Sequence, residues 1–336
     1  MNRDTWPVKR ILPGHHLARL VTVIGFLCLV TAPAEAEKPV RLGLFAWEES
    51  ECRIEAFHAG LRELGYVEGR DIVTECRHAG GRYKGLEAAA EEIVRTKPDV
   101  IVALHHAYAY ALRRLGTDIP TVVITSGDPV ATGFAASLAR PGGSMTGLTY
   151  YAGELNAKRL ELLKAVAPRI KRVAVLVEAD APEKLNDLHI RDSMAAAKQL
   201  GLELRVVEAR EGVDLDRAFQ EVVKWKADAV HVLPSIVFAY ESQKIADLAR
   251  WYGLPTMHFY NGFPALGGLI AYGPDFPVLQ RRAAVYVDKI LKGAKPGELP
   301  IEQPNLFKLI INRETAAEFG LTIPPAVLLR ADKVIE

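Results

Sequence analysis

Short apolar, β-branched segments alternate with segments of helical period along the chain from residue 40 onward. The first pair is a strand-like run over Val40–Phe45 and a segment over 54–64, in which apolar residues recur every three or four positions. Gly65 follows, where helices commonly end. Strands that alternate with helices of this length pair in parallel, because each helix returns the chain to the start of the next strand. The pattern therefore predicts an α/β fold.

The same alternation predicts the remaining elements. The expected strands cover 71–76, 100–104, 121–125, 269–273 and 307–312, and the expected helices cover 83–96, 107–114, 132–139 and 278–291.

Four landmarks of the first half recur in the same order in the second half, at offsets of 131, 136, 129 and 135 residues. They pair Arg41–Phe45 with Arg172–Leu176, Glu63–Gly65 with Gln199–Gly201, Lys97–Leu104 with Lys226–Leu233, and Ile119–Thr121 with Leu254–Thr256. A shared offset predicts two similar, doubly wound, Rossmann-like parallel-sheet lobes.

The residues after 273 are too few for a third domain, so we expect them to complete the two lobes. One lobe then comprises 37–149 and 274–304, and the other comprises 150–273 and 305–336. Several chain crossings would form a multi-strand hinge, as in proteins whose two lobes close on a ligand.

The first 36 residues are typical of a secretory signal peptide. Basic residues precede an apolar run over 20–30, and Ala34–Ala36 fits the cleavage site, with Glu37 as the first mature residue. The alternative, a membrane anchor, needs about 20 apolar residues. We expect a protein exported to the periplasm.

The chain has 42 basic and 41 acidic side chains, and removal of the leader leaves 38 and 39. This near-neutral balance argues against binding to nucleic acid or to anionic membranes. We expect a monomer whose ligand is a small molecule.

Motifs for catalysis and cofactor binding are missing. The chain has no Gly-x-Gly-x-x-Gly after a strand, no phosphate-binding Gly-Lys-Ser/Thr loop, no His-Glu-x-x-His and no Gly-x-Ser-x-Gly. His105 and His106 are adjacent at a predicted strand end, where they would point to opposite sides and not share a metal. We expect no catalytic residues, no cofactor and no metal.

Candidate ligand contacts follow the predicted strands, because open α/β sheets bind ligands at their carboxyl ends. Ser126 and Asp128 could hold a polar head group, although Asp128 could instead close a turn on its own backbone. Trp47 and Glu48 follow the first strand, opposite Glu178 in the second lobe.

Six tyrosines lie at or near strand ends or crossovers: Tyr108, Tyr150, Tyr151, Tyr240, Tyr260 and Tyr272. Several could form an aromatic wall, or about half could simply pack between lobe and hinge. The complete predicted contact set is Trp47, Glu48, His105, Ser126, Asp128, Tyr150, Glu178, Ser235, Tyr260, Tyr272 and Asp275. Cys52 and Cys76 could form a disulfide in the periplasm or remain two thiols.

The chain resembles the extracytoplasmic substrate-binding proteins of ABC transporters with the type I periplasmic binding fold, a family that includes tryptophan- and tyrosine-related binders. The segments that carry the resemblance are Phe57–Arg70, Ser126–Val130, Ser137–Gly143, Lys158–Leu163, Gly268–Asp275, Val287–Pro296 and Gly320–Pro325. The resemblance implies a two-lobed receptor that delivers a solute to membrane permease subunits. By matching position, it implies ligand contacts at Ser126 and Asp128 and a hinge or cleft role for Tyr272 and Asp275.

The sequence departs from the family at 105–108, where small residues such as Gly-Thr-Pro-Ala are common, and Cys52 and Cys76 are also atypical. Two other functions stay open: a secreted α/β enzyme, and a ligand-sensing protein that works with a membrane sensor. A repressor would carry a DNA-binding segment where this chain has its export signal.

Overall fold

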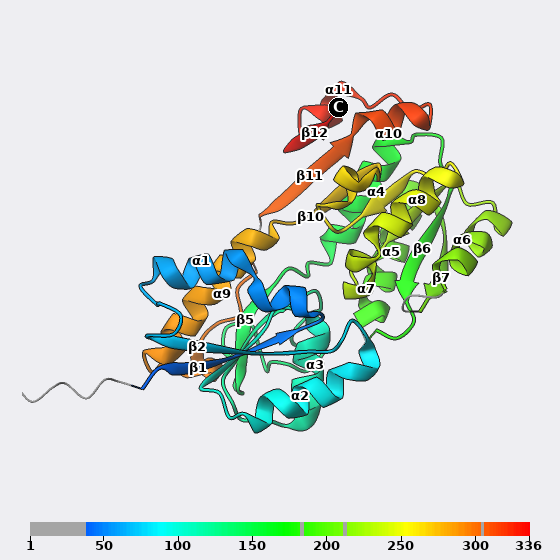
Figure 1. The fold of residues 1–336 in the computed structure, drawn as a ribbon. Helices are drawn as coiled ribbons and strands as arrows, with labels where there is room; N and C mark the ends of the chain where they lie inside the picture. The colour runs from blue at the N-terminus through cyan, green and yellow to red at the C-terminus, as the bar shows by residue number, and fades with distance from the viewer. Residues whose placement is uncertain (1–37, 182–184, 211–213, 304–305) are drawn as a thin grey trace, which may run out of the picture. The chain divides into compact units, whose positions relative to one another are not determined.

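The computed structural model describes residues 38–181, 185–210, 214–303 and 306–336 (Figure 1). The predicted signal peptide lies outside the described residues.

A five-stranded parallel sheet has the strand order β2-β1-β3-β4-β5. Its strands are β1 (Val40–Ala46), β2 (Ile72–His78), β3 (Val100–Ala103), β4 (Thr121–Thr125) and β5 (Met145–Thr149). The helices in this part of the chain are the 3₁₀ turns η1 (Glu49–Arg53) and η2 (Tyr83–Gly85), with α1 (Glu55–Glu63), α2 (Leu86–Arg95) and α3 (His106–Leu115). Every residue of β3 and β4 is buried, as expected for parallel strands covered by helices on both faces.

A second sheet has seven strands in the order β12-β11-β10-β9-β8-β6-β7. Its strands are β6 (Arg172–Glu178), β7 (Glu203–Ala209), β8 (Ala229–Val232), β9 (Thr256–His258), β10 (Ile270–Pro274), β11 (Phe307–Asn312) and β12 (Lys333–Ile335). β11 is antiparallel to β10, and the other pairings are parallel. The accompanying helices are α4 (Glu154–Val166), α5 (Leu185–Leu200), α6 (Leu215–Lys224), α7 (Ile236–Tyr240), α8 (Ser242–Trp251), η3 (Phe263–Leu266), α10 (Arg313–Glu318) and α11 (Pro325–Leu328).

The two sheets repeat one design, which confirms the prediction of two α/β lobes. Numbered along the chain, the strands of the first sheet and the first five of the second both follow the order 2-1-3-4-5. Lys97 and Lys226, one landmark pair, are the described non-glycine residues with positive φ, at 50° and 59°. Two residues later, Asp99 and Asp228 each accept a backbone N–H from the start of the neighbouring strand, both at 2.8 Å. The repeat therefore extends to individual hydrogen bonds.

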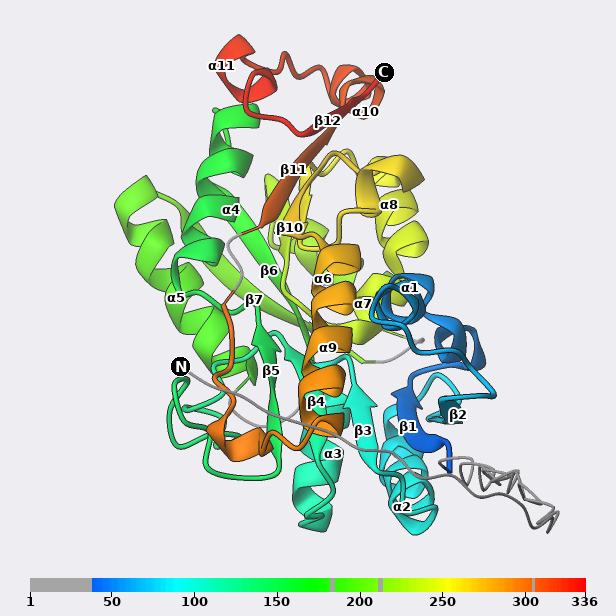
Figure 2. The same cartoon turned by 90° about the vertical axis from the view of Figure 1, so that its left-hand side faces the viewer.

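The chain passes between the sheets three times. It leaves the first sheet after β5, and after β10 it returns as α9 (Phe276–Leu291), which packs against α1 and β4 (Figure 2). The turn η4 (Pro296–Glu298) follows, and Glu302 then pairs with Leu148 at the edge of β5. The third passage leads into β11.

The predicted helix over 132–139 is wrong. These residues form consecutive turns, in which the N–H groups of Phe134 and Ala135 both bond to the carbonyl of Pro129. Gly133 adopts a left-handed conformation (φ 75°), which interrupts a right-handed helix.

Candidate functional site

A cleft of about 750 Å³ lies between the two sheets. It is lined by the carboxyl end of β3, the starts of α3 and α9, the segment leading through α7, and the loop after β9. Its apolar and aromatic lining comprises Leu104, Tyr150, Ile236, Ala239, Tyr240, Phe259, Tyr260, Leu266, Phe276 and Pro277. Its polar lining comprises Glu51, His105, Ser235, Asn261 and Gln280, with Gly262 beside them. The volume suits one small solute.

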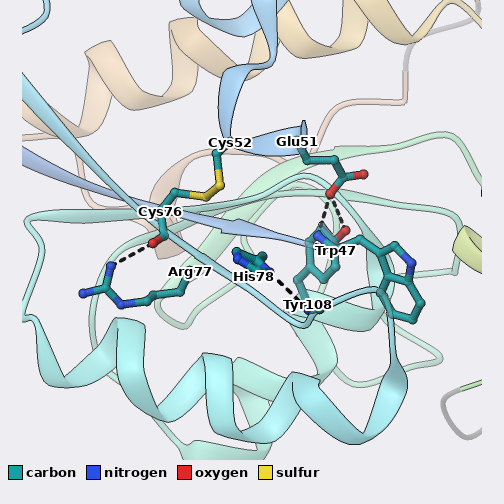
Figure 3. Close-up of a disulfide and its surroundings, with 8 residues drawn as sticks. Trp47, Glu51, Cys52, Cys76, Arg77, His78 and Tyr108 are labelled. Atoms are coloured by element: carbon teal, nitrogen blue, oxygen red, sulfur yellow. Dashed lines mark hydrogen bonds between the residues drawn. A yellow bond between two sulfur atoms is a disulfide. The ribbon is translucent and has the colours of Figure 1, made fainter. Parts of the chain in front are cut away.

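The Glu51 carboxylate is held at the cleft by its own lobe (Figure 3). Its Oε2 atom accepts the Trp47 N–H at 2.7 Å and the Tyr108 hydroxyl at 2.6 Å. Tyr240 approaches from the other lobe, and burial together with this carboxylate raises the pKa of the Tyr240 hydroxyl. Burial and Glu51 raise the pKa of Tyr108 in the same way. The phenols therefore stay protonated and available as donors to the carboxylate.

The two adjacent histidines have different surroundings, because His105 is the extended residue before α3 and His106 is the first residue of that helix. His105 lines the cleft and caps α3, with Nδ1 accepting the Ala107 N–H at 3.2 Å. His106 points into the core, where Nδ1 lies 2.6 Å from Thr125 Oγ1. Burial lowers the pKa of each to about 3, so both are neutral at pH 7. Among the described residues, no three His, Cys, Asp or Glu side chains are grouped as a metal site.

Ser235 connects the cleft to a polar contact between the lobes. Its hydroxyl caps α7 by accepting the Phe238 N–H and donates to Glu178, which is 1% exposed. Glu178 also accepts the hydroxyl of Tyr83, from the first lobe, at 3.1 Å. The ring of Trp47 packs edge-on against Tyr83, with centroids 5.2 Å apart. Trp47 and Glu178 thus belong to this contact and do not line the cleft.

Ser126 and Asp128 lie outside the cleft lining. Asp128 Oδ1 accepts the N–H groups of Val130 at 2.8 Å and Ala131 at 3.2 Å, which is the turn that the sequence left as an alternative. Ser126 is buried, and its carbonyl lies 3.1 Å from His189 Nε2 of the second lobe.

The remaining three predicted contacts also lie elsewhere. Glu48 lies against Gly81. Tyr272 packs on Phe307, with ring centroids 5.8 Å apart. Asp275 caps α9 through the Val278 N–H at 3.4 Å. His105, Tyr150, Ser235 and Tyr260 are the predicted residues that the structure brings together at the cleft.

Sequence reasoning missed several lining residues, including Glu51, Phe259, Asn261, Phe276 and Gln280. These residues do not directly follow the predicted strands, where ligand contacts were expected. Glu51 lies five residues past β1 on a 3₁₀ turn, and Phe276 and Gln280 lie on α9, far along the chain from the strands they face. Phe276 could have been found from the sequence, because it follows Asp275 near residue 274, where the chain was expected to pass from one lobe to the other.

Cys52 and Cys76 form a disulfide, with Cα atoms 5.7 Å apart, that joins η1 to β2 (Figure 3). Cys52 is next to Glu51, so the bond fixes the turn that carries the cleft carboxylate. None of the described helices has the length and apolarity needed to cross a bilayer.

Comparison with known proteins identifies the family. The chain is 25% identical over 262 residues to a tyrosine-binding protein of Clostridioides difficile, an alignment that covers 77% of this chain and 74% of that protein. A conserved domain protein of Vibrio cholerae has a TM-score of 0.81 at 25% identity, covering 88% of this chain and 100% of that one. The ABC domain of Streptococcus pneumoniae in complex with L-Trp has a TM-score of 0.80 at 23% identity, covering 89% and 100%. The family model for ABC transporter substrate binding proteins matches residues 50–335, and the chain therefore belongs to that family.

Proposed function

We propose that this protein is the extracytoplasmic receptor of an ABC importer, which captures a small solute in the cleft and delivers it to the membrane permease. The observation that carries the proposal is the cleft itself. Residues of both lobes line it, with Glu51 and His105 on one side and Tyr240 and Tyr260 on the other. Such a site can couple ligand binding to the relative position of the lobes.

The proposal includes the lobe boundaries and the hinge. One lobe comprises residues 37–149 and 274–304, and the other comprises 150–273 and 305–336. The packing of α9 on α1 and β4 supports this division. The direct contacts Tyr83–Glu178 and His189–Ser126 would form on closure and break on opening, so a solute that contacts both sides favours the closed arrangement.

The proposal also covers location and partners. Residues 1–36 act as a signal peptide that is cleaved near Ala36, and the mature monomer works in the periplasm. Its partners are the solute and the permease subunits. It binds no nucleic acid, uses no cofactor and releases its solute chemically unchanged.

The related proteins support a small aromatic or amino-acid-like solute, since one is a tyrosine-binding protein and another was solved with L-Trp. A secreted enzyme would instead convert the bound compound, and a protein that works with a sensor would bind it without supporting uptake.

The test is a thermal-shift screen of the purified protein, stripped of bound solute by unfolding and oxidative refolding, against amino acids, aromatic metabolites, amines and nucleobases. A ligand at 100 times its Kd stabilises the folded state by about 2.7 kcal/mol. We expect one class to raise the Tm and to come back unaltered. The variant Ala239→Trp, which fills the cleft, should lose the shift, while Ala265→Trp, on the exposed side of η3, should keep it.

Uptake of that solute into cells that carry the permease, with and without this protein, tests the transport step. Equal uptake in both strains would contradict the importer role, and conversion of the solute by the purified protein would favour the enzyme.

A further inference from the structure

We infer that the cleft selects a small aromatic cation: a compound with one ammonium or amidinium group, an apolar ring and no carboxylate. This inference rests on the proposed function and names the solute class for the same site.

The cleft lining carries a net negative charge. Glu51 is the only lining residue with a formal charge at neutral pH, because no lysine or arginine is among them and His105 is neutral. Within the described part of the chain, Glu51 takes part in no ion pair. The donors of its own lobe, Trp47 N–H and the Tyr108 hydroxyl, are neutral, and so is the Tyr240 hydroxyl that approaches from the other lobe. A solute that enters the cleft displaces water from this carboxylate. A cationic group compensates that loss, whereas a neutral or anionic group does not.

The helix starts at the cleft each have one backbone N–H group engaged by a side-chain cap. Three helices begin at the cleft, and each is capped by a side chain of this protein: His105 on α3, Ser235 on α7 and Asp275 on α9. These caps take backbone N–H groups that could otherwise bind an anion. At α9 the cap is itself a carboxylate, and Pro277 in the first turn has no N–H.

Two buried charged groups, Arg159 and Glu178, are outside the cleft lining. Arg159 is fully buried and does not line the cleft. Its Nε donates to the carbonyl of Tyr272 at 2.8 Å and its Nη1 to Asn156 Oδ1 at 3.1 Å, while its Nη2 is buried with no hydrogen-bond partner among the described residues. Glu178, also buried, accepts the hydroxyl of the cleft residue Ser235.

Aromatic rings make up much of the cleft lining. Tyr150 contacts Phe276 edge-on with ring centroids 5.6 Å apart, and Tyr260 is tilted against Phe276 at 6.5 Å. Tyr240 completes the aromatic surface near Glu51. Ring faces of this kind stabilise an apolar ring by contact and a cation through their negative faces. Gln280 on α9 offers an amide to a polar substituent on the ring.

The experiment compares three compounds that share one phenol ring and differ only in charge: tyramine, tyrosine and 3-(4-hydroxyphenyl)propanoate. Each is titrated calorimetrically into the stripped protein. We expect tyramine to bind at least tenfold more tightly than tyrosine, and the propanoate to bind more weakly still. Glu51→Gln should weaken tyramine binding by about ten- to a hundredfold. The matched control Glu49→Gln, on an exposed position of the same turn, should bind as the unmodified protein does.

Preferred binding of tyrosine or of the propanoate would overturn the inference while leaving the receptor function intact. An equal effect of Glu51→Gln and Glu49→Gln would also overturn it. If none of the three compounds binds, native mass spectrometry of the protein as isolated decides between the two proposals. A carried-over amine supports the inference. A carried-over solute without a cationic group refutes the inference but leaves the receptor function intact. A protein that carries nothing and binds nothing refutes the receptor function as well.

Discussion

At the scale of single residues, the position of the Glu51 carboxylate depends on two donors, and the Tyr108 hydroxyl is the one that a mutation can remove. Tyr108→Phe keeps the ring that packs on Phe45, at a centroid distance of 4.9 Å, and deletes the hydrogen bond. We expect tyramine to bind about fivefold more weakly, consistent with about 1 kcal/mol for one hydrogen bond. Calorimetric titration measures this, with Tyr110→Phe on the same helix as the control. Equal affinities of the two variants would show that Tyr108 does not position the carboxylate.

The sequence predicts the environment of a single side chain only where the local backbone conformation determines it. The alternation expected for His105 and His106 assumed extended backbone at both residues, whereas the structure has His105 extended and His106 as the first residue of α3. The sequence could not choose between a ligand contact and a turn for Asp128, because both need only an acceptor after a strand. In the structure the N–H groups of Val130 and Ala131 donate to Oδ1 of Asp128 and form the turn, and the ligand contact stays a prediction.

At the scale of elements, the turn η1 contains no fully buried residue, so the disulfide is its main anchor to β2. We expect the double variant Cys52→Ser, Cys76→Ser to lose about 2 to 4 kcal/mol of unfolding free energy and to bind tyramine more weakly at temperatures where it is fully folded. Urea unfolding and calorimetry measure the two effects. The unmodified mature protein should show no reactive thiol when unfolded without reductant, and two reactive thiols would contradict the bond.

Long periodic elements were predictable, and irregular ones were not. The strand over 121–125 was predicted to the residue, and the helix over 278–291 differs from α9 only by its first two residues. Residues 132–139 were misread as a helix because small residues permit a helix, while Gly133 and the turn bonds to Pro129 exclude it. β12 was not predicted, because three residues are too few to show an alternation of apolar and polar side chains. Its pairing with β11 depends on tertiary contact.

At the scale of the whole molecule, buried histidines predict a loss of stability in mild acid. Burial lowers the pKa of His105, His106 and His258 to about 3 and that of His189 to about 4. The unfolded chain takes up protons near pH 6.5, whereas the folded chain does not. Their contribution is therefore complete above pH 6.5 and is lost progressively as the pH falls toward 3 to 4. Urea midpoints at pH 7, 6 and 5 check this, and equal midpoints would contradict it.

The two lobes were predictable because the same sequence landmarks recur in each lobe at nearly one offset. Lys97 and Lys226, for example, occupy the same turn in the two lobes. The cleft was only partly predictable. Its lining comes from η1, α7, the loop after β9 and α9, and no local pattern states which of these segments face one another. That depends on how the three passages between the sheets place α9.

The central claim is that the chain holds a small solute between its lobes, and native mass spectrometry of the protein as isolated from cells tests it most directly. We predict that the unmodified protein and Ala265→Trp carry the same small solute in a one-to-one complex, while Ala239→Trp, with its cleft filled, carries none. The same bound mass on Ala239→Trp, or no bound solute on any of the three proteins, would contradict the account.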